Sequence, residues 1–208
     1  MAERLVDTTL RAFSDDLASS AAVPGGGSAA AYAGAIGAAL AAMVGRIAEK
    51  KERTDATTAL IGEADNLRAD FLRLVDDDSA AFARVSEAMK LPKTTDEEKK
   101  ARRERLQAAL LGASRVPLEL AKTSRRLLDL CERGMASAPA AAVSDIGVGA
   151  LMAEAALRGA ALNVMINLAS ISDAAQVKAL SEDLDRAVDG AEAQRKRITD
   201  FVESRIAR

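Results

Sequence analysis

Residues 24–51 read PGGGSAAAYAGAIGAALAAMVGRIAEKK, and this stretch decides how the chain folds. The three glycines permit backbone conformations closed to other residues, so a loop here can leave N–H groups pointing at a ligand beside a helix N-terminus. The alternative is that the glycines only turn the chain and Ser28 caps the next helix. No charge appears from Ser28 to Gly45. The stretch therefore predicts a central helix from Ser28 to about Lys51 that its neighbours approach closely.

Apolar residues recur three and four positions apart along most of the chain, which predicts an all-α protein. Thr94 or Thr95, followed three residues later by Glu97 or Glu98, predicts a capping box at the start of one helix. Asp173 is the predicted N-cap of the last helix. Besides the segment from Ser28, four helices are predicted over Leu5–Leu17, Asp55–Lys90, about Ala141–Leu168 and Asp173–Val202. A further helix is predicted to begin at the Thr–Glu capping box and to reach Glu132, with a kink or a break at Pro117. About six antiparallel helices make a single bundle domain over residues 1–208.

Composition excludes several classes of function. The chain has 29 Lys and Arg against 31 Asp and Glu and only 2% aromatic residues, which argues against nucleic-acid binding. Its apolar stretches are mostly alanine and glycine, which favours bundle helices over membrane spans. A single cysteine, Cys131, and an N-terminus unlike a secretory signal favour the cytoplasm. Histidine is absent, so His-containing triads and metal sites are excluded and we expect no metal.

Two aspartates are candidates for chemistry. Asp145 lies in the otherwise apolar segment 141–168, where a carboxylate is costly to bury unless it is paired, hydrogen-bonded or used as a base. Its alternative is a capping or helix-dipole role beside Ser144. Asp78 precedes Phe82 by four residues and so shares a helix face with a residue expected in the core. Its neighbours Asp76 and Asp77 are expected in solvent.

Lys51 and Asn163 are candidates for binding. Lys51 ends the second predicted helix, about 34 Å from the glycines at 1.5 Å per residue, where it either caps the helix or binds an anionic tail. Asn163 and Asn167 share a face, either as ligand contacts or as buried amides. Asn163 faces the same way as Asp145 but stands about 27 Å away, so both serve one pocket only across a subunit boundary. Two helices of small residues also predict a homodimer.

Together these segments resemble the cyclodeaminase/cyclohydrolase family, which includes bacterial methenyltetrahydrofolate cyclohydrolases and the C-terminal domain of formiminotransferase-cyclodeaminase. The resemblance rests on PGGGS at 24–28, Leu91-Pro92-Lys93 with TDEEK at 95–99, Val116-Pro117-Leu118, SDIGV at 144–148 and LRGAALNVMIN at 157–167. It implies an all-helical homodimer that acts on a one-carbon tetrahydrofolate near the subunit interface, with no further cofactor. By position it implies two catalytic carboxylates, Asp145 and Asp78, and substrate contacts from Pro24, Gly25, Gly26, Gly27, Ser28, Lys51 and Asn163.

The resemblance leads us to expect hydrolysis of 5,10-methenyltetrahydrofolate to 10-formyltetrahydrofolate. In that reaction Asp145 deprotonates the attacking water and Asp78 supplies a second carboxylate. The first alternative is cyclodeamination of formimidoyltetrahydrofolate, an ammonia-lyase reaction. The second is a non-catalytic helical dimer that binds a folate or a protein, because Ala138-Pro139-Ala140-Ala141 replaces an asparagine-bearing family segment.

Overall fold

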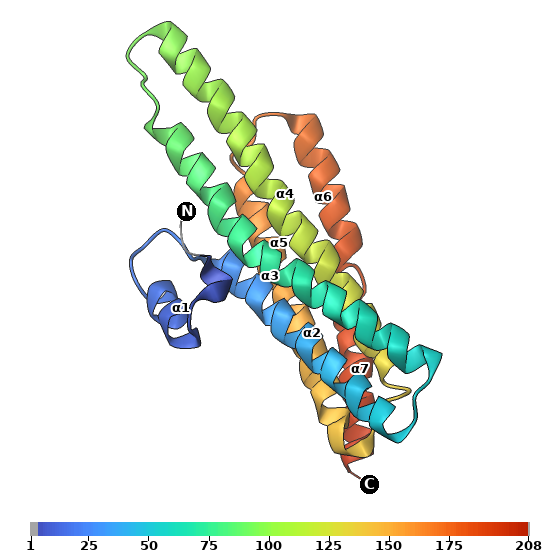
Figure 1. Cartoon of the computed structure of the whole chain (residues 1–208). Helices are drawn as coiled ribbons and strands as arrows, with labels where there is room; N and C mark the ends of the chain where they lie inside the picture. The colour runs from blue at the N-terminus through green and yellow to red at the C-terminus, as the bar shows by residue number, and fades with distance from the viewer. Residues whose placement is uncertain (1–3, 208) are drawn as a thin grey trace.

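The computed structural model describes residues 4–207, and within this range every regular element is a helix. The α-helices are α1 (Leu10–Leu17), α2 (Gly26–Lys51), α3 (Asp55–Lys90), α4 (Asp96–Gly134), α5 (Val143–Leu168), α6 (Ala174–Val188) and α7 (Ala191–Ile206), with 3₁₀ turns at Leu5–Asp7 and Ala140–Ala142. Figure 1 shows an elongated bundle in which the joined ends of α3 and α4 project beyond the other helices. The helices α6 and α7 follow one another along α4 and α5, and α1 lies to one side.

The helix α2 packs against α3 and α5, as its small residues predict. A Cβ atom on Gly34 would lie 2.3 Å from Cε1 of Phe71, and one on Gly37 would lie 2.9 Å from the carbonyl oxygen of Gly149. Only glycine fits such contacts, so its helix-propensity cost is offset by close packing. The predicted start at Ser28 is wrong by two residues, because Gly25 is the N-cap and the helix begins at Gly26.

The helix α4 continues through Pro117, so the predicted break there is wrong. Proline has no N–H, which leaves the carbonyl oxygen of Ala113, four residues earlier, without its helical donor. The side chain of Asn167 on α5 takes that place, since its Nδ2 donates to the Ala113 oxygen at 2.8 Å. A tertiary hydrogen bond thus satisfies the carbonyl group that the proline deprives of a partner.

Both predicted caps are confirmed, and one predicted helix is two. Thr95 and Glu98 form the capping box of α4, and the Asp173 side chain accepts from the N–H groups of Ala175 and Gln176. The last predicted helix is interrupted at Gly190, whose φ of 66° lies in the left-handed region that glycine tolerates. The interruption lets α7 turn onto α5 where α6 has packed on α4.

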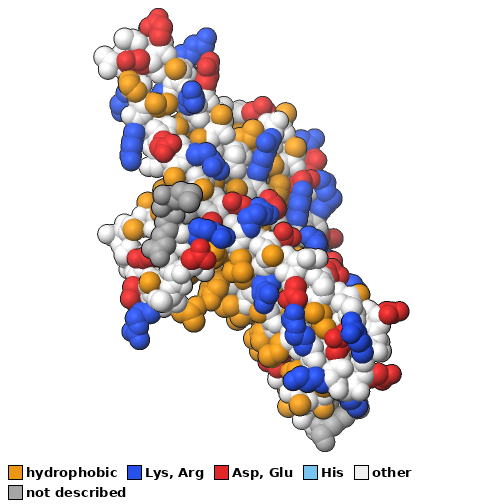
Figure 2. Space-filling view, viewed as in Figure 1, with side chains coloured by type: hydrophobic (Ala, Val, Ile, Leu, Met, Phe, Trp, Pro, Cys, Tyr) orange, Lys and Arg blue, Asp and Glu red, His pale blue; other side chains and the backbone are white. Residues whose placement is uncertain are grey.

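One side of α2 and α5 carries apolar side chains that nothing among residues 4–207 covers. On α5 the exposed residues Val148, Leu151, Leu162, Met165 and Ile166 recur at helical spacing, and Ile36 and Met43 on α2 are also exposed. Figure 2 shows hydrophobic side chains gathered beside α2 on the visible face. By length and composition alone, α2 and residues 140–168 are also apolar enough to cross a membrane, although 61% and 50% of their most apolar windows are buried inside the bundle.

Candidate active site

The carboxylate of Asp78 rests on the first turn of α2. Asp78 Oδ2 lies 3.0 Å from the hydroxyl oxygen of Ser28, and the Ser28 N–H also donates to this carboxylate. A Cβ atom on Gly27 would lie 2.1 Å from Asp78 Oδ1, so only glycine leaves room for the carboxylate here. The N-cap, Gly25, has no side chain to cap the helix. A side chain of α3 therefore supplies the negative charge that a helix N-terminus favours.

Burial raises the pKa of Asp78 above the ordinary value of 3.8 for aspartate. Desolvation is the largest cause, and the hydrogen bonds from Ser28 act in the opposite direction. A carboxylate with a raised pKa is a stronger base once it is ionised, and it can return a proton at a higher pH than a solvated one. Asp78 therefore has the properties of a group that moves a proton.

A pocket of about 360 Å³ opens beside Asp78. Its walls combine the backbone of Gly25 and Gly26 with apolar side chains from four segments, namely Val23, Phe82, Val85, Met89, Leu110 and Ile166. The expected core position of Phe82 is wrong, since the ring is 46% exposed and faces this pocket with Asp78. Apolar walls around one carboxylate suit a flat heterocyclic ligand with a polar edge.

The two asparagines of α5 also line this pocket, and the structure separates their roles. Asn167 is held by its bond to Ala113. Asn163 donates from Nδ2 to the carbonyl oxygen of Gly159 at 2.8 Å, and this Nδ2 lies 3.7 Å from where a Cβ atom on Gly26 would be. Its own carbonyl oxygen is left as an acceptor for a ligand N–H. Asn163 therefore lies opposite the start of α2, where its amide can accept a hydrogen bond at the pocket.

Some residues of the glycine-rich segment line the pocket, and the others are buried behind it. Gly25 and Gly26 line the pocket, whereas Pro24, Gly27 and Ser28 are buried. Ser28 is fully buried and also contacts the carbonyl oxygen of Val75 and the hydroxyl of Ser79. Its predicted direct contact with substrate is corrected: the hydroxyl orients Asp78, because it lies behind the carboxylate rather than at the pocket surface.

Each member of the acidic cluster has a different role. Asp76, expected in solvent, accepts from the N–H of Leu5 at 2.9 Å and from Arg4 Nε at 3.0 Å, so it anchors the N-terminal segment to α3. Asp77 pairs with Arg73 on the surface. Of the three carboxylates only Asp78 reaches the pocket.

Lys51 lies at the opposite end of α2 from this pocket. The unbroken helix places it about 38 Å from Gly26 at 1.5 Å per residue. There it is exposed and lines a separate groove of about 420 Å³ with Thr54, Ser137 and Arg205. Within one chain, Lys51 and Asp78 do not share a ligand.

Asp145 lies in the first turn of α5, half-buried and without a side-chain hydrogen bond to a cap position. It does not line the pocket beside Asp78. Because α5 is unbroken, about 27 Å of helix separates Asp145 from Asn163. The single chain therefore does not bring the two predicted catalytic carboxylates together.

The cysteine and the remaining acidic side chains that the structure describes do not form a second reactive site. Cys131 is fully buried, and burial raises the pKa of its thiol to about 12. Among residues 4–207, no three Asp, Glu or Cys side chains gather as a metal-binding cluster. The pocket residues that sequence reasoning missed are mostly apolar, among them Val23, Phe82, Val85, Met89, Leu110 and Ile166. For Phe82 the signal was its spacing of four from Asp78, which was interpreted as a core position.

Known proteins share this architecture along nearly the whole chain. A methenyltetrahydrofolate cyclohydrolase of Methylorubrum extorquens is 39% identical over 95% of this chain and 97% of its own length. The formimidoyltransferase-cyclodeaminase of Mus musculus is 39% identical over 82% of this chain, which covers 32% of the mouse protein. The crystal structure of formiminotetrahydrofolate cyclodeaminase from Thermotoga maritima superposes with a TM-score of 0.84 at 26% identity, covering 95% of this chain and 97% of that one. Residues 9–186 match the formiminotransferase-cyclodeaminase family, and the chain belongs to it.

Proposed function

We propose that this protein hydrolyses 5,10-methenyltetrahydrofolate to 10-formyltetrahydrofolate. The observation that carries the proposal is the desolvated carboxylate of Asp78, held on the N-terminus of α2 at the edge of an apolar pocket. Support also comes from the relative named methenyltetrahydrofolate cyclohydrolase, which aligns with nearly all of both chains. The flat, cationic methenyl ring system fits apolar walls beside a negative charge.

The chemistry needs one water and one group that moves a proton. Water attacks the methenyl carbon, and Asp78 accepts a proton from it as the tetrahedral intermediate forms. The bond from this carbon to the ring nitrogen then breaks, and the electron pair stays on that nitrogen. One water proton ends on the ring nitrogen and the other is released to solvent, while the water oxygen becomes the formyl oxygen. Before the attack, the negative charge of Asp78 also favours binding of the cationic ring.

A homodimer supplies the second carboxylate in this proposal. The exposed stripe on α5 is centred about midway between Val148 and Ile166, and a twofold contact pairs such a stripe with itself. An antiparallel contact brings Asp145 of the partner subunit level with the C-terminal end of α5, where Asn163 lines the pocket. The same operation carries the partner subunit's Lys51 toward this end. Burying the stripe supplies the hydrophobic free energy of association.

The second candidate is cyclodeamination of formimidoyltetrahydrofolate in the same pocket, where ammonia leaves and the methenyl bridge closes. The specific observation in its favour is the fold shared with the Thermotoga maritima cyclodeaminase. A third candidate is a dimer that binds a folate or a protein without turnover. In all three cases we propose a cytoplasmic protein that needs no metal and no cofactor besides the folate.

The direct test is to mix the purified protein with 5,10-methenyltetrahydrofolate and follow the loss of its near-ultraviolet absorption, with the formimino substrate in parallel. We expect Asp78→Asn to lower kcat at least about 100-fold. Asp77→Asn is the matched control, because Asp77 is adjacent but pairs with Arg73 on the surface. Full activity in Asp78→Asn would overturn the assignment, and tight binding without turnover in the unaltered protein would select the third candidate.

Subunit complementation tests the composite site. Asp78→Asn and Asp145→Asn homodimers should each be inactive, but a mixed dimer contains one site with both carboxylates intact. Equal, fully exchanged mixtures should therefore recover about a quarter of the unaltered activity, since half of the dimers are mixed and each has one working site. No recovery despite subunit exchange, verified by mass spectrometry, would show that Asp145 does not complete a site with Asp78 of the partner subunit.

A further inference from the structure

The projecting arm of α3 and α4 contains a second cavity that the proposed reaction does not use. This groove has a volume of about 720 Å³ and lies between the two helices near their joined ends. Along α4 it extends from Ala101 to Gly112, which is about 16 Å at 1.5 Å per residue. Its floor consists of small residues, namely Ala88, Ala101, Ala108, Ala109 and Gly112. A Cβ atom added to Gly112 would meet nothing within 4 Å, so the groove is open at that end.

The groove and the folate pocket share no lining residue, and most of the α3 residues that line them lie on different sides of that helix. Phe82 and Val85 line the folate pocket, whereas Arg84 and Glu87, two positions later in each case, line the groove. Residues two positions apart on a helix point about 200° apart. A ligand in the groove therefore does not touch Asp78.

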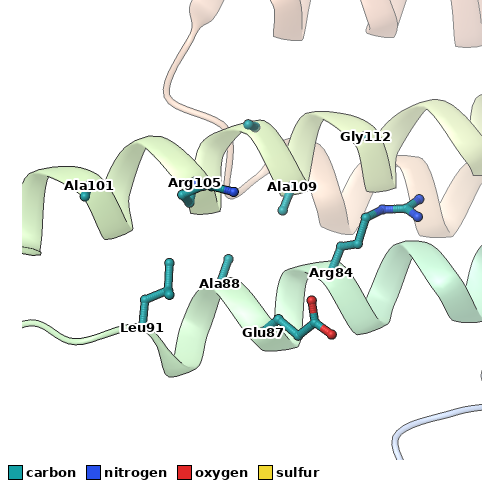
Figure 3. A pocket seen from close by; sticks show the side chains of 9 residues that line it. Arg84, Glu87, Ala88, Leu91, Ala101, Arg105, Ala109 and Gly112 are labelled. Carbon is teal, nitrogen blue, oxygen red and sulfur yellow. The ribbon is translucent and has the colours of Figure 1, made fainter.

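Arginines from both helices enter this groove. In Figure 3, Arg84 extends from α3 toward α4 near Gly112, and Arg105 stands on α4 opposite Ala88. Two nearby cations that do not line the groove are engaged elsewhere, since Arg102 donates to the carbonyl oxygen of Met89 and Lys99 pairs with Asp96. Within residues 4–207, Arg84 and Arg105 have no hydrogen-bond or ion-pair partner of this kind. Their guanidinium groups are free to bind an anion.

We propose that the groove binds an elongated small molecule with an acidic group at each end and an apolar spine. Two guanidinium groups at different levels of the groove suit two separated carboxylates or phosphates, because arginine binds both through paired N–H donors. The alanine and glycine floor accommodates the apolar spine between them. The single acidic group of the lining, Glu87, leaves an excess of one positive charge and so favours an anion.

Calorimetric titration of the full chain at low ionic strength, without folate, tests this site. Suberate is the dicarboxylate probe, hexane-1,6-diyl bisphosphate is the phosphate probe, and octanoate is the single-acid control. We expect both two-acid probes to bind at least about ten-fold more tightly than octanoate, because one charge-assisted contact accounts for such a factor. The tighter of the two probes identifies the acid group that the groove prefers.

Variants distinguish the groove from general surface charge. Arg84→Gln and Arg105→Gln should each weaken binding about ten-fold, and Glu87→Gln should strengthen it about two-fold by removing a repulsive charge. Arg103→Gln is the matched control, since Arg103 is exposed on α4 and lies two positions from Ala101 and Arg105, so it points away from the groove. Equal binding of octanoate, or equal losses in Arg103→Gln and Arg84→Gln, would overturn the proposal. Asp78→Asn should leave this binding unchanged, so the outcome is independent of the proposed hydrolysis.

Discussion

The two ends of α2 differ in how the surrounding helices treat a charged side chain. At the N-terminal end, Asp78 is withdrawn from water, fitted against Gly27 and oriented by Ser28. At the C-terminal end, Lys51 is exposed in an open groove beside Arg205. The first environment raises the proton affinity of a carboxylate, as general acid–base catalysis requires. The second leaves a solvated cation that can attract an anion but does not alter its reactivity.

The largest effect should come from filling the space at Gly27. Gly27→Ala places a Cβ atom 2.1 Å from Asp78 Oδ1, so the carboxylate must move. We expect a loss of about 1–3 kcal/mol in unfolding free energy and an activity loss of at least about 100-fold. Gly26→Ala is the control for stability, because its nearest neighbour would be Asn163 Nδ2 at 3.7 Å. Thermal unfolding of both variants and turnover by Gly27→Ala check this, and equal losses of stability at the two positions would contradict it.

A second test uses pH at the N-terminal end. Because burial raises the pKa of Asp78 above 3.8, the ionised base is lost as the pH falls through that raised value. We expect kcat/KM to fall on the acid side with a midpoint above 3.8, and this limb to be absent from the residual activity of Asp78→Asn. The raised pKa also means that the folded state prefers the protonated carboxyl, so Asp78 lowers stability as the pH rises from 3.8 through the folded-state value. An acid limb retained in Asp78→Asn would assign it to another group.

Substitutions of Pro117 on α4 and Asn167 on α5, beside the pocket, should have non-additive effects on the free energy of unfolding. Asn167→Ala leaves the Ala113 carbonyl oxygen unsatisfied and should cost about 1–3 kcal/mol of unfolding free energy. In a Pro117→Ala background the restored N–H can serve that oxygen, so the same substitution should cost less than about 1 kcal/mol. Urea unfolding of the four proteins in this cycle measures the coupling. Additive effects would show that Asn167 stabilises the protein in another way.

The smallest effect is expected at the C-terminal end of α2. If the partner subunit's Lys51 attracts the anionic part of the folate, Lys51→Gln should raise KM about three-fold and leave kcat unchanged, as expected for a solvated ion pair. Lys50→Gln is the control, since Lys50 is exposed on the same turn but does not line the groove. A fall in kcat for Lys51→Gln would mean that Lys51 contributes to the chemical step, and so that both ends of α2 carry catalytic groups.

Much of the fold could be predicted because its signals are local. The period of apolar residues placed α3 over Asp55–Lys90, and the Thr95–Glu98 box and Asp173 marked two helix starts. The errors arose where another part of the chain overrides the local signal. Pro117 is tolerated inside α4 because Asn167 satisfies the carbonyl group that proline leaves without a partner. Phe82 faces the pocket because its side of α3 is left open, although Ala81 and Val85 on the same turn are buried against α4.

By itself the sequence determined the all-helical class, the close packing along α2 and the residues from which a site could be built, since these depend on side-chain type and short-range spacing. Only the tertiary structure decided which residues meet. It placed Asp78, Gly26 and Asn163 at one pocket and left Lys51 and Asp145 at the other end of the bundle. The physical reason is that rigid helices of 26 residues separate groups at opposite ends by nearly 40 Å, whatever their chemistry suggests.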